Sequence, residues 1–172
     1  MANAGEIHEA AKTGGLKRVT ALLDKDSSLL YVKDEQGKTP LHWATGRGQL
    51  EVILLLLETY HVDVNVRNDN GGTPLHVAAS QAKPEVAKIL IQHNAMINAR
   101  TKDGATPLHF AAFKRRKGHL EAARILLENN ADVNAKMDNG ATPLSMALFS
   151  GNTEMANLLR QYGAKGQPGV PR

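Results

Sequence analysis

Apolar residues return along the chain in a fixed order: a short apolar cluster, a second and longer apolar run, and then a polar stretch. The short cluster follows a tetrapeptide, Thr-Pro-Leu-His, that starts at residues 39, 73 and 106, and a variant, Thr-Pro-Leu-Ser, starts at 142. These starts are 34, 33 and 36 residues apart. A period of this length predicts a row of similar units, none of which can bury its apolar face alone.

Two helices and a connecting loop are predicted for each unit. Threonine is a favoured helix N-cap and proline is favoured at the first helical position, so each Thr-Pro marks the start of a first helix. The leucine is expected to point into the stack, and the small alanines after it let two helices approach closely. A second apolar run, such as LEVILLLLE, predicts the second helix, which makes the fold all-α. The motif residues are Thr39, Pro40, Leu41, His42, Thr73, Pro74, Leu75, His76, Thr106, Pro107, Leu108, His109, Thr142, Pro143 and Leu144.

Left-handed backbone positions are predicted at both ends of the connecting loops. Asn-Gly, Asp-Gly and Gly-Gly pairs stand before Thr-Pro motifs, and glycine supplies the positive φ that a tight turn needs. Asn94, Asn130 and Gly163 stand where the second helices are expected to end in a left-handed residue. The sequence therefore predicts short β-hairpin-like loops between the units.

Taken together, these motifs resemble the ankyrin repeat, with its T-P-L-H-x-A signature and a period of about 33 residues. The resemblance covers roughly residues 5–164 and implies an ankyrin-repeat solenoid of five helix-turn-helix repeats. The first copy lacks T-P-L and the last lacks a following hairpin, as expected of capping repeats. One domain is expected over residues 1–164, followed by a flexible tail over residues 165–172. The expected repeats are approximately 5–35, 36–69, 70–102, 103–138 and 139–164.

Seven histidines raise the question of a metal site. Four recur at the repeat period, and the resemblance implies that they are neutral, buried and hydrogen-bonded to the adjoining hairpin. Successive copies would lie about 10 Å apart, too far to share one metal ion, so no metal ligand is predicted. The four are His8, His42, His76 and His109. The others, expected at helix ends as caps or surface residues, are His61, His93 and His119.

Two of the copies are longer than the others. From the motif histidine to the asparagine of the following Val-Asn or Ile-Asn pair, the three central copies span 23, 22 and 25 residues. The first of these has one extra residue near Thr59–His61, at the end of its second helix. The last has three extra residues between Phe113 and Gly118, so Lys114–Lys117 is predicted to occupy an enlarged turn between two helices.

The basic sequence of this turn has several interpretations. It could be a solvated surface loop, an element that binds a partner protein, a nuclear-localisation signal, or a contact to nucleic acid. Four cations alone would give weak and salt-sensitive binding to phosphates, without base readout. The hairpin tips carry charges of both signs and no aromatic residue is spaced for stacking on nucleotides. A nucleic-acid role is therefore not favoured.

The resemblance implies that partners meet a concave face formed by the hairpin tips and the first helices. The two positions after each alanine pair point toward that face, and they include Phe113 and Phe149. Aromatic residues beside arginines are typical of interaction hot spots. Alternatively, Phe113 packs under the enlarged turn and Phe149 shields the last repeat, while Trp43 is expected to be half-buried. The candidate protein-binding residues are Arg47, Gln81, Phe113, Lys114, Arg115, Arg116, Lys117 and Phe149.

Composition narrows the possible functions. Hydrophobic residues make up 42% and aromatic residues 4% of the chain, which predicts an aliphatic core, and the net charge is +4. The absence of cysteine excludes disulfides, thiolate catalysis and zinc fingers. No catalytic or phosphate-binding motif is present, so we expect no enzyme, cofactor or small-molecule substrate. We expect a monomeric module that binds another protein, lies in the cytoplasm or nucleus and has no membrane segment. The alternative is an architectural scaffold without a ligand.

Overall fold

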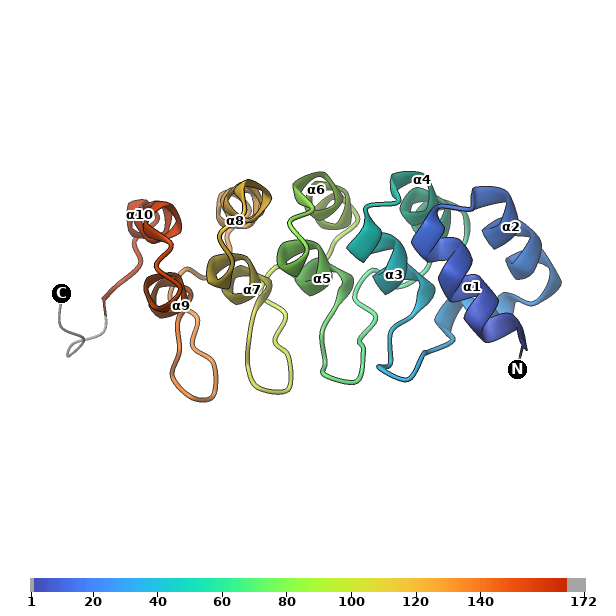
Figure 1. The fold of residues 1–172 in the computed structure, drawn as a ribbon, viewed down its shortest axis with the longest axis horizontal. Coiled ribbons are helices and arrows are strands. Elements are labelled where there is room, and N and C mark those ends of the chain that lie inside the picture. The colour runs from blue at the N-terminus through green and yellow to red at the C-terminus, as the bar shows by residue number, and fades with distance from the viewer. Residues whose placement is uncertain (1, 167–172) are drawn as a thin grey trace.

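The computed structural model describes residues 2–166, which form a single row of helix pairs (Figure 1). No β-strand is assigned within this range. Besides its α-helices, this range contains the 3₁₀ helix η1 (Ser27–Tyr31) and the π-helical η2 (Leu55–Thr59). The α-helices are α1 (Ala2–Thr13), α2 (Leu16–Lys25), α3 (Pro40–Arg47), α4 (Leu50–Leu54), α5 (Pro74–Ser80), α6 (Pro84–Gln92), α7 (Pro107–Phe113), α8 (Lys117–Glu128), α9 (Pro143–Phe149) and α10 (Thr153–Gln161).

The helices form two rows. The inner row consists of α1, α3, α5, α7 and α9, each packed on the next, and in the outer row α6 packs on α8 and α8 on α10. The loops that lead into the inner helices all extend from the same side of the stack (Figure 1). The main helix contacts lie within a pair or between neighbouring pairs, which is the arrangement of a repeat solenoid. The predicted all-α repeat fold is confirmed.

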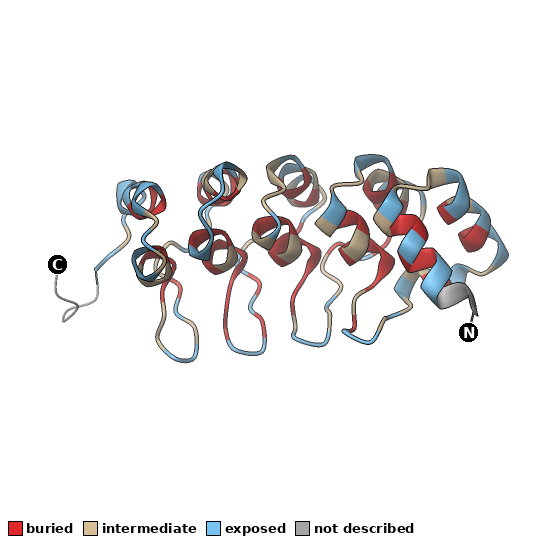
Figure 2. Cartoon of the chain, in the orientation of Figure 1, coloured by how far each residue is buried: buried red, intermediate tan, exposed pale blue. Residues whose placement is uncertain are grey.

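The core is a continuous aliphatic layer between the two rows. The motif leucines are at most 2% exposed, and the alanines that follow them on α3, α5, α7 and α9 are fully buried. Buried residues run through both rows of helices and into the loops (Figure 2). Because alanine has no bulk beyond Cβ, the inner helices approach one another while the leucines fill the space between the rows.

Each Thr-Pro-Leu-His motif joins its own helix to the next loop. In α5 the Thr73 N–H donates to His76 Nδ1 at 3.0 Å, and the Thr73 hydroxyl lies 2.9 Å from the same nitrogen. The opposite nitrogen, Nε2, lies 3.1 Å from the carbonyl oxygen of Ala105 in the following loop. Because a carbonyl only accepts, Nε2 is the nitrogen that carries the proton. The same bond joins His42 to Gly72 and His109 to Ala141.

The loops also bond directly to one another. Each one is closed at its base by a backbone hydrogen bond, as from the Asn68 N–H to the Gly72 carbonyl oxygen at 2.9 Å. At the tips, the N–H of a residue in one loop donates to a carbonyl of the loop before it, as from Lys102 to Asn70 at 3.0 Å. The glycine two positions before each Thr-Pro pair has a positive φ, between 69° and 82°. Each loop is therefore held by its own turn and by its neighbour.

The second helices end as the sequence predicts, with one variation. Asn94 and Asn130 have φ of 67° and Gly163 has φ of 86°. In the second unit His61 takes this position with φ of 52°, and the extra residue predicted near it is absorbed by η2, where the Tyr60 N–H bonds to the carbonyl of Leu55, five residues earlier. A π-helical turn accommodates one added residue without lengthening the loop that follows.

The ends of the row are closed by bonds within and between units. In the first unit His8 Nε2 lies 3.0 Å from the Val32 carbonyl oxygen. At the other end the Lys165 N–H donates to Asn134 Oδ1 at 2.8 Å, so this first residue of the predicted tail is still attached to the stack. Residues 167–172 of that tail lie outside the described residues. The number of repeats and their bounds stay predictions.

Substituting loop glycines should show how much the loop-to-loop contact stabilises the stack. A Cβ at Gly37 would lie 2.5 Å from the Asp69 backbone nitrogen, whereas a Cβ at Gly140, in the last loop, meets nothing within 4 Å. Gly140→Ala should cost about 1 kcal/mol for its left-handed backbone, and Gly37→Ala about 1–3 kcal/mol more. Urea denaturation followed by circular dichroism measures both values. Equal losses in the two variants would mean that the loops do not stabilise one another.

The buried histidines make folding stability depend on pH. Burial lowers the pKa of His42 and of His76 to about 4, against the opposing effect of their carbonyl partners. The unfolded chain takes up these protons near pH 6.5, so the stability from neutral burial is present above pH 6.5 and is lost as the pH falls toward 4. Between pH 7 and pH 5 the free energy of unfolding should fall by about 2 kcal/mol for each histidine.

A serine variant provides the control for this measurement. Ser145 takes the histidine position in the last motif and accepts the Thr142 N–H at 2.8 Å. The double variant His42→Ser/His76→Ser should be less stable than the parent chain at pH 7, because it lacks the bonds to the next loop. It should also lose less stability between pH 7 and pH 5. A loss equal to that of the parent chain would show that other groups cause the pH dependence.

Candidate protein-binding surface

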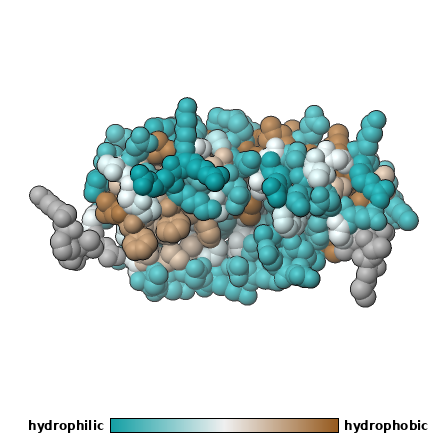
Figure 3. Space-filling model, in the orientation of Figure 1, coloured by the Kyte–Doolittle hydropathy of each residue, from teal (hydrophilic) through white to brown (hydrophobic). Residues whose placement is uncertain are grey.

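The two predicted aromatic residues occupy the same position on neighbouring inner helices. Phe113 is the last residue of α7 and Phe149 the last residue of α9. Their side chains are 45% and 86% exposed, so Phe149 does not shield the last unit and Phe113 is covered on one side only. Leu148, beside Phe149, is 47% exposed. In the space-filling view, hydrophobic residues gather over α7 and α9 (Figure 3).

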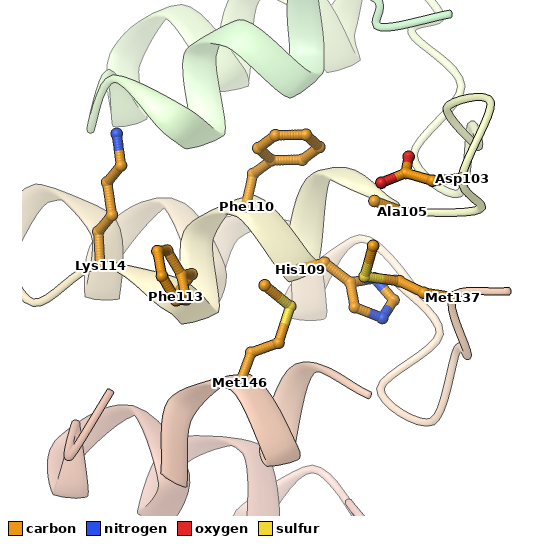
Figure 4. A pocket seen from close by; sticks show the side chains of 8 residues that line it. All are labelled: Asp103, Ala105, His109, Phe110, Phe113, Lys114, Met137 and Met146. Atoms are coloured by element: carbon orange, nitrogen blue, oxygen red, sulfur yellow. The ribbon is translucent and has the colours of Figure 1, made fainter. Parts of the chain in front are cut away.

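A pocket of about 210 Å³ lies between α7 and α9, and we call it the α7–α9 groove. Within it the side chains of Phe113 and Met146 point toward one another, while Lys114 points away toward α5 (Figure 4). Asp103, on the loop before α7, lies at the opposite side of the groove from Lys114. The groove is therefore apolar in its middle and carries opposite charges at its two ends. Its lining residues are Asp103, Ala105, His109, Phe110, Phe113, Lys114, Met137 and Met146.

Sequence reasoning missed the apolar residues that complete this groove. Phe110 and Met146 stand one position after the motif histidine or serine, where Trp43 and Val77 stand in the earlier units. Phe110 is half-buried and meets the ring of His76 edge-on, with ring centroids 5.5 Å apart. A comparison of this position between copies would have found an apolar residue in each of the four units that carry the Thr-Pro-Leu motif, whereas the first unit has Glu9 there. It would not have shown that two of them share a groove with Phe113.

The basic turn lies beside the groove. Lys114, Arg115, Arg116 and Lys117 are all exposed, and none of the four forms an ion pair with a residue in the described range 2–166. Lys114 Nζ donates to the Ser80 carbonyl oxygen at 3.2 Å. The prediction of an enlarged turn is wrong, because Lys117 is the first residue of α8 and the connection before it has three residues, as many as the connection between α5 and α6. The three added residues instead lengthen α8 to 12 residues, against 9 in α6, because they continue the helix by one turn at its start.

A second pocket of about 510 Å³ adjoins the basic turn, and we call it the basic pocket. Lys114 lines both this pocket and the α7–α9 groove. Of the predicted binding residues, Gln81 lies in the basic pocket, whereas Arg47, Lys117 and Phe149 line neither of the two. The lining residues of the basic pocket are Ser80, Gln81, Lys114, Arg115, Arg116 and His119.

His119 lies near a helix end, as expected, but the expectation that it could be a surface residue is wrong, because only 2% of it is exposed. It is the third residue of α8, and its Nε2 lies 3.1 Å from the Ser80 carbonyl oxygen. Burial lowers the pKa of His119, which favours the neutral imidazole that donates through Nε2. Nδ1 is buried without a hydrogen-bond partner in the described chain. His119 therefore attaches the start of α8 to the end of α5.

Trp43 is half-buried, as predicted, and its ring is already surrounded by side chains of its own unit and the one before. Its Nε1–H donates to Asp34 Oδ2 at 2.9 Å. The ammonium groups of Lys38 and Lys12 lie 4.9 and 5.6 Å from the ring centroid, within the range of cation–π interactions. The tryptophan therefore stabilises the first two units, and its interactions do not depend on a partner.

Within residues 2–166, no group of three or more metal-ligating side chains comes together, and no helix is long and apolar enough to cross a bilayer. A protein-family model described as ankyrin repeats (3 copies) matches the chain at residues 6–68, 59–137 and 100–168. These overlapping matches extend over nearly the whole sequence. No curated protein matches it.

Alanine substitutions should separate exposed from structural aromatic residues. Phe149→Ala should change the free energy of unfolding by less than about 0.5 kcal/mol, because the side chain is 86% exposed. Phe113→Ala should cost about 1–2 kcal/mol, because the groove covers part of its ring. Urea denaturation provides both values. A loss of about 3 kcal/mol or more in either variant would place that side chain in the core instead of on a binding surface.

Proposed function

Because the chain belongs to the ankyrin-repeat family, whose members are generally protein–protein interaction modules, we propose that it binds a partner protein without catalysing a reaction. The partner meets the concave face and is centred on the α7–α9 groove. The proposed module is one domain over residues 1–164, built of five repeats at the predicted bounds. It acts as a monomer, in the cytoplasm or nucleus, and needs no cofactor.

The observation that carries this proposal is the exposure of large apolar side chains on the inner face of the last two units. Phe149, Leu148 and Phe113 are 86%, 47% and 45% exposed. Contiguous exposed apolar residues are unfavourable in water and mark interaction sites when polar residues surround them. Here the surrounding residues are Lys114 on one side and the loop residue Asp103 on the other. Burial of these side chains by a partner would supply the main gain in free energy.

The rigid stack supports binding through preorganisation. Phe113 and Phe149 stand at the ends of helices whose first turns are fixed by Thr106 and Thr142 and whose alanines are fully buried. Little conformational freedom remains to be lost when a partner docks, so more of the contact energy appears as affinity. The same rigidity gives the apolar residues a fixed spacing, which favours a partner of matching shape.

Cross-linking mass spectrometry in the native lysate tests the proposal. The parent chain should form cross-links from residues near the groove to a reproducible partner. The double variant Phe113→Ala/Phe149→Ala should lose at least about 90% of this partner signal, since central aromatic residues commonly contribute about 2 kcal/mol or more each. Its circular dichroism spectrum should match that of the parent chain.

A matched control removes exposed apolar area elsewhere. Leu50 and Met96 are 40% and 59% exposed and belong to neither the groove nor the basic pocket. The variant Leu50→Ala/Met96→Ala should retain the partner. The proposal is wrong if the control and the phenylalanine variant lose the partner equally, or if a partner is retained in full without both phenylalanines.

A further inference from the structure

We propose that the partner contributes an extended segment with one large apolar residue, which enters the α7–α9 groove, and with acidic residues on one side of it that reach the basic pocket. This inference rests on the proposed function and names the chemistry of the segment that the site recognises. The proposed interaction has two separable parts: an apolar anchor in the groove and an electrostatic contact in the basic pocket. Each part can be removed without the other.

The acidic part follows from the unsatisfied charge of the basic turn. Lys114, Arg115, Arg116 and Lys117 stand together with exposed side chains, and none of them pairs with a carboxylate in the described residues. The other groups that line the basic pocket are the uncharged Ser80 and Gln81 and the buried His119. The pocket therefore has a positive potential that no lining side chain neutralises, and carboxylates are complementary to it.

The two parts are adjacent because they share a residue. Phe113 lines the groove, and the next residue, Lys114, lines both the groove and the basic pocket. An extended chain advances by about 3.3–3.6 Å for each residue. The nearest acidic residue of the partner should therefore lie within about four positions of the apolar anchor. A longer spacer would carry it past the pocket.

The charge at the other end of the groove determines on which side of the anchor acidic residues can bind. Asp103 lies at the side of the groove opposite Lys114 (Figure 4). The hydrogen bond from the Thr101 hydroxyl lowers the pKa of Asp103, so its carboxylate is charged at neutral pH. It repels acidic residues on that side of the anchor. Acidic residues are thus accepted at one side of the anchor only.

A protein segment fits these features better than a nucleic acid does. The positive charge is not continuous, because the loop tips beside the groove carry charges of both signs, as at Lys102 and Asp103, and so do not form a single track for a phosphate backbone. The apolar groove offers no charged partner for a phosphate backbone along its middle, but it accommodates a leucine, methionine or phenylalanine side chain. The experiment includes a DNA duplex to test this alternative.

Selection from a random 12-residue peptide library on the purified full chain tests the inference. We expect enriched peptides to share a large apolar residue with two or more acidic residues within about four positions on one side. Fluorescence anisotropy of an enriched peptide should then show about a tenfold loss of affinity in Lys114→Gln/Arg115→Gln/Arg116→Gln, which removes the three charges that line the basic pocket. The loss should shrink as salt is raised from about 50 mM to 500 mM, because exposed charges are screened.

A control variant with the same change in net charge is Lys17→Gln/Lys25→Gln/Lys136→Gln, whose lysines are exposed and line neither pocket. It should keep the affinity of the parent chain within about twofold. Equal losses in the two triple variants, an enriched motif without acidic residues, or tighter binding of a labelled DNA duplex would overturn the inference.

The same peptides distinguish this failure from a failure of the proposed function. Peptides that bind independently of the basic turn but lose binding in Phe113→Ala/Phe149→Ala would leave the proposed function standing and remove only the acidic part. Peptides that bind equally well without both phenylalanines, or a library that yields no enriched sequence, would count against both.

Discussion

The bond from each motif histidine to the next loop is the interaction on which the stack depends. His42, His76 and His109 use Nδ1 to hold the threonine that begins their own helix and Nε2 to hold a carbonyl of the following unit. One buried side chain thus fixes the start of a helix and its distance from a neighbour. A buried imidazole can serve both roles only while it is neutral, and burial itself lowers the histidine pKa. The neutral, buried histidine therefore contributes both to the stability of the stack and to the spacing of its units.

Because each unit is held mainly by its neighbours, the stack tolerates local changes that a single compact core would not. One added residue in the second unit is taken up by the π-helical turn η2. Three added residues in the fourth unit lengthen α8, which has 12 residues against 9 in α6, while the connection before it keeps the three-residue length found between α5 and α6. That connection supplies the lysine and arginines of the basic pocket. The residues proposed to bind a partner thus differ between units at a position where the length of the unit can change without altering the inner helices.

The period of the sequence was sufficient to predict the framework. Repeated motifs identified the inner helices, the left-handed residues Asn94 and Asn130, and the histidines of the stack, because each position recurs with one structural cause. The errors concern residues without a counterpart in the other copies. His119 lies in the first turn of α8, which has no counterpart in α6, and no repeated pattern indicated that its ring reaches Ser80, 39 residues away. The groove was missed for the same reason, since Met146 and Phe113 line it from two different units.

The central claim is that a rigid row of helices presents one binding face at α7 and α9. Hydrogen–deuterium exchange of the chain, free and bound to its cross-linked partner, tests this claim most directly. Protection should increase in α7, in α9 and in residues 113–117, while the outer helices α4, α6 and α10 exchange as they do in the free chain. Increased protection centred on the outer helices, or spread evenly along the inner row, would contradict the account.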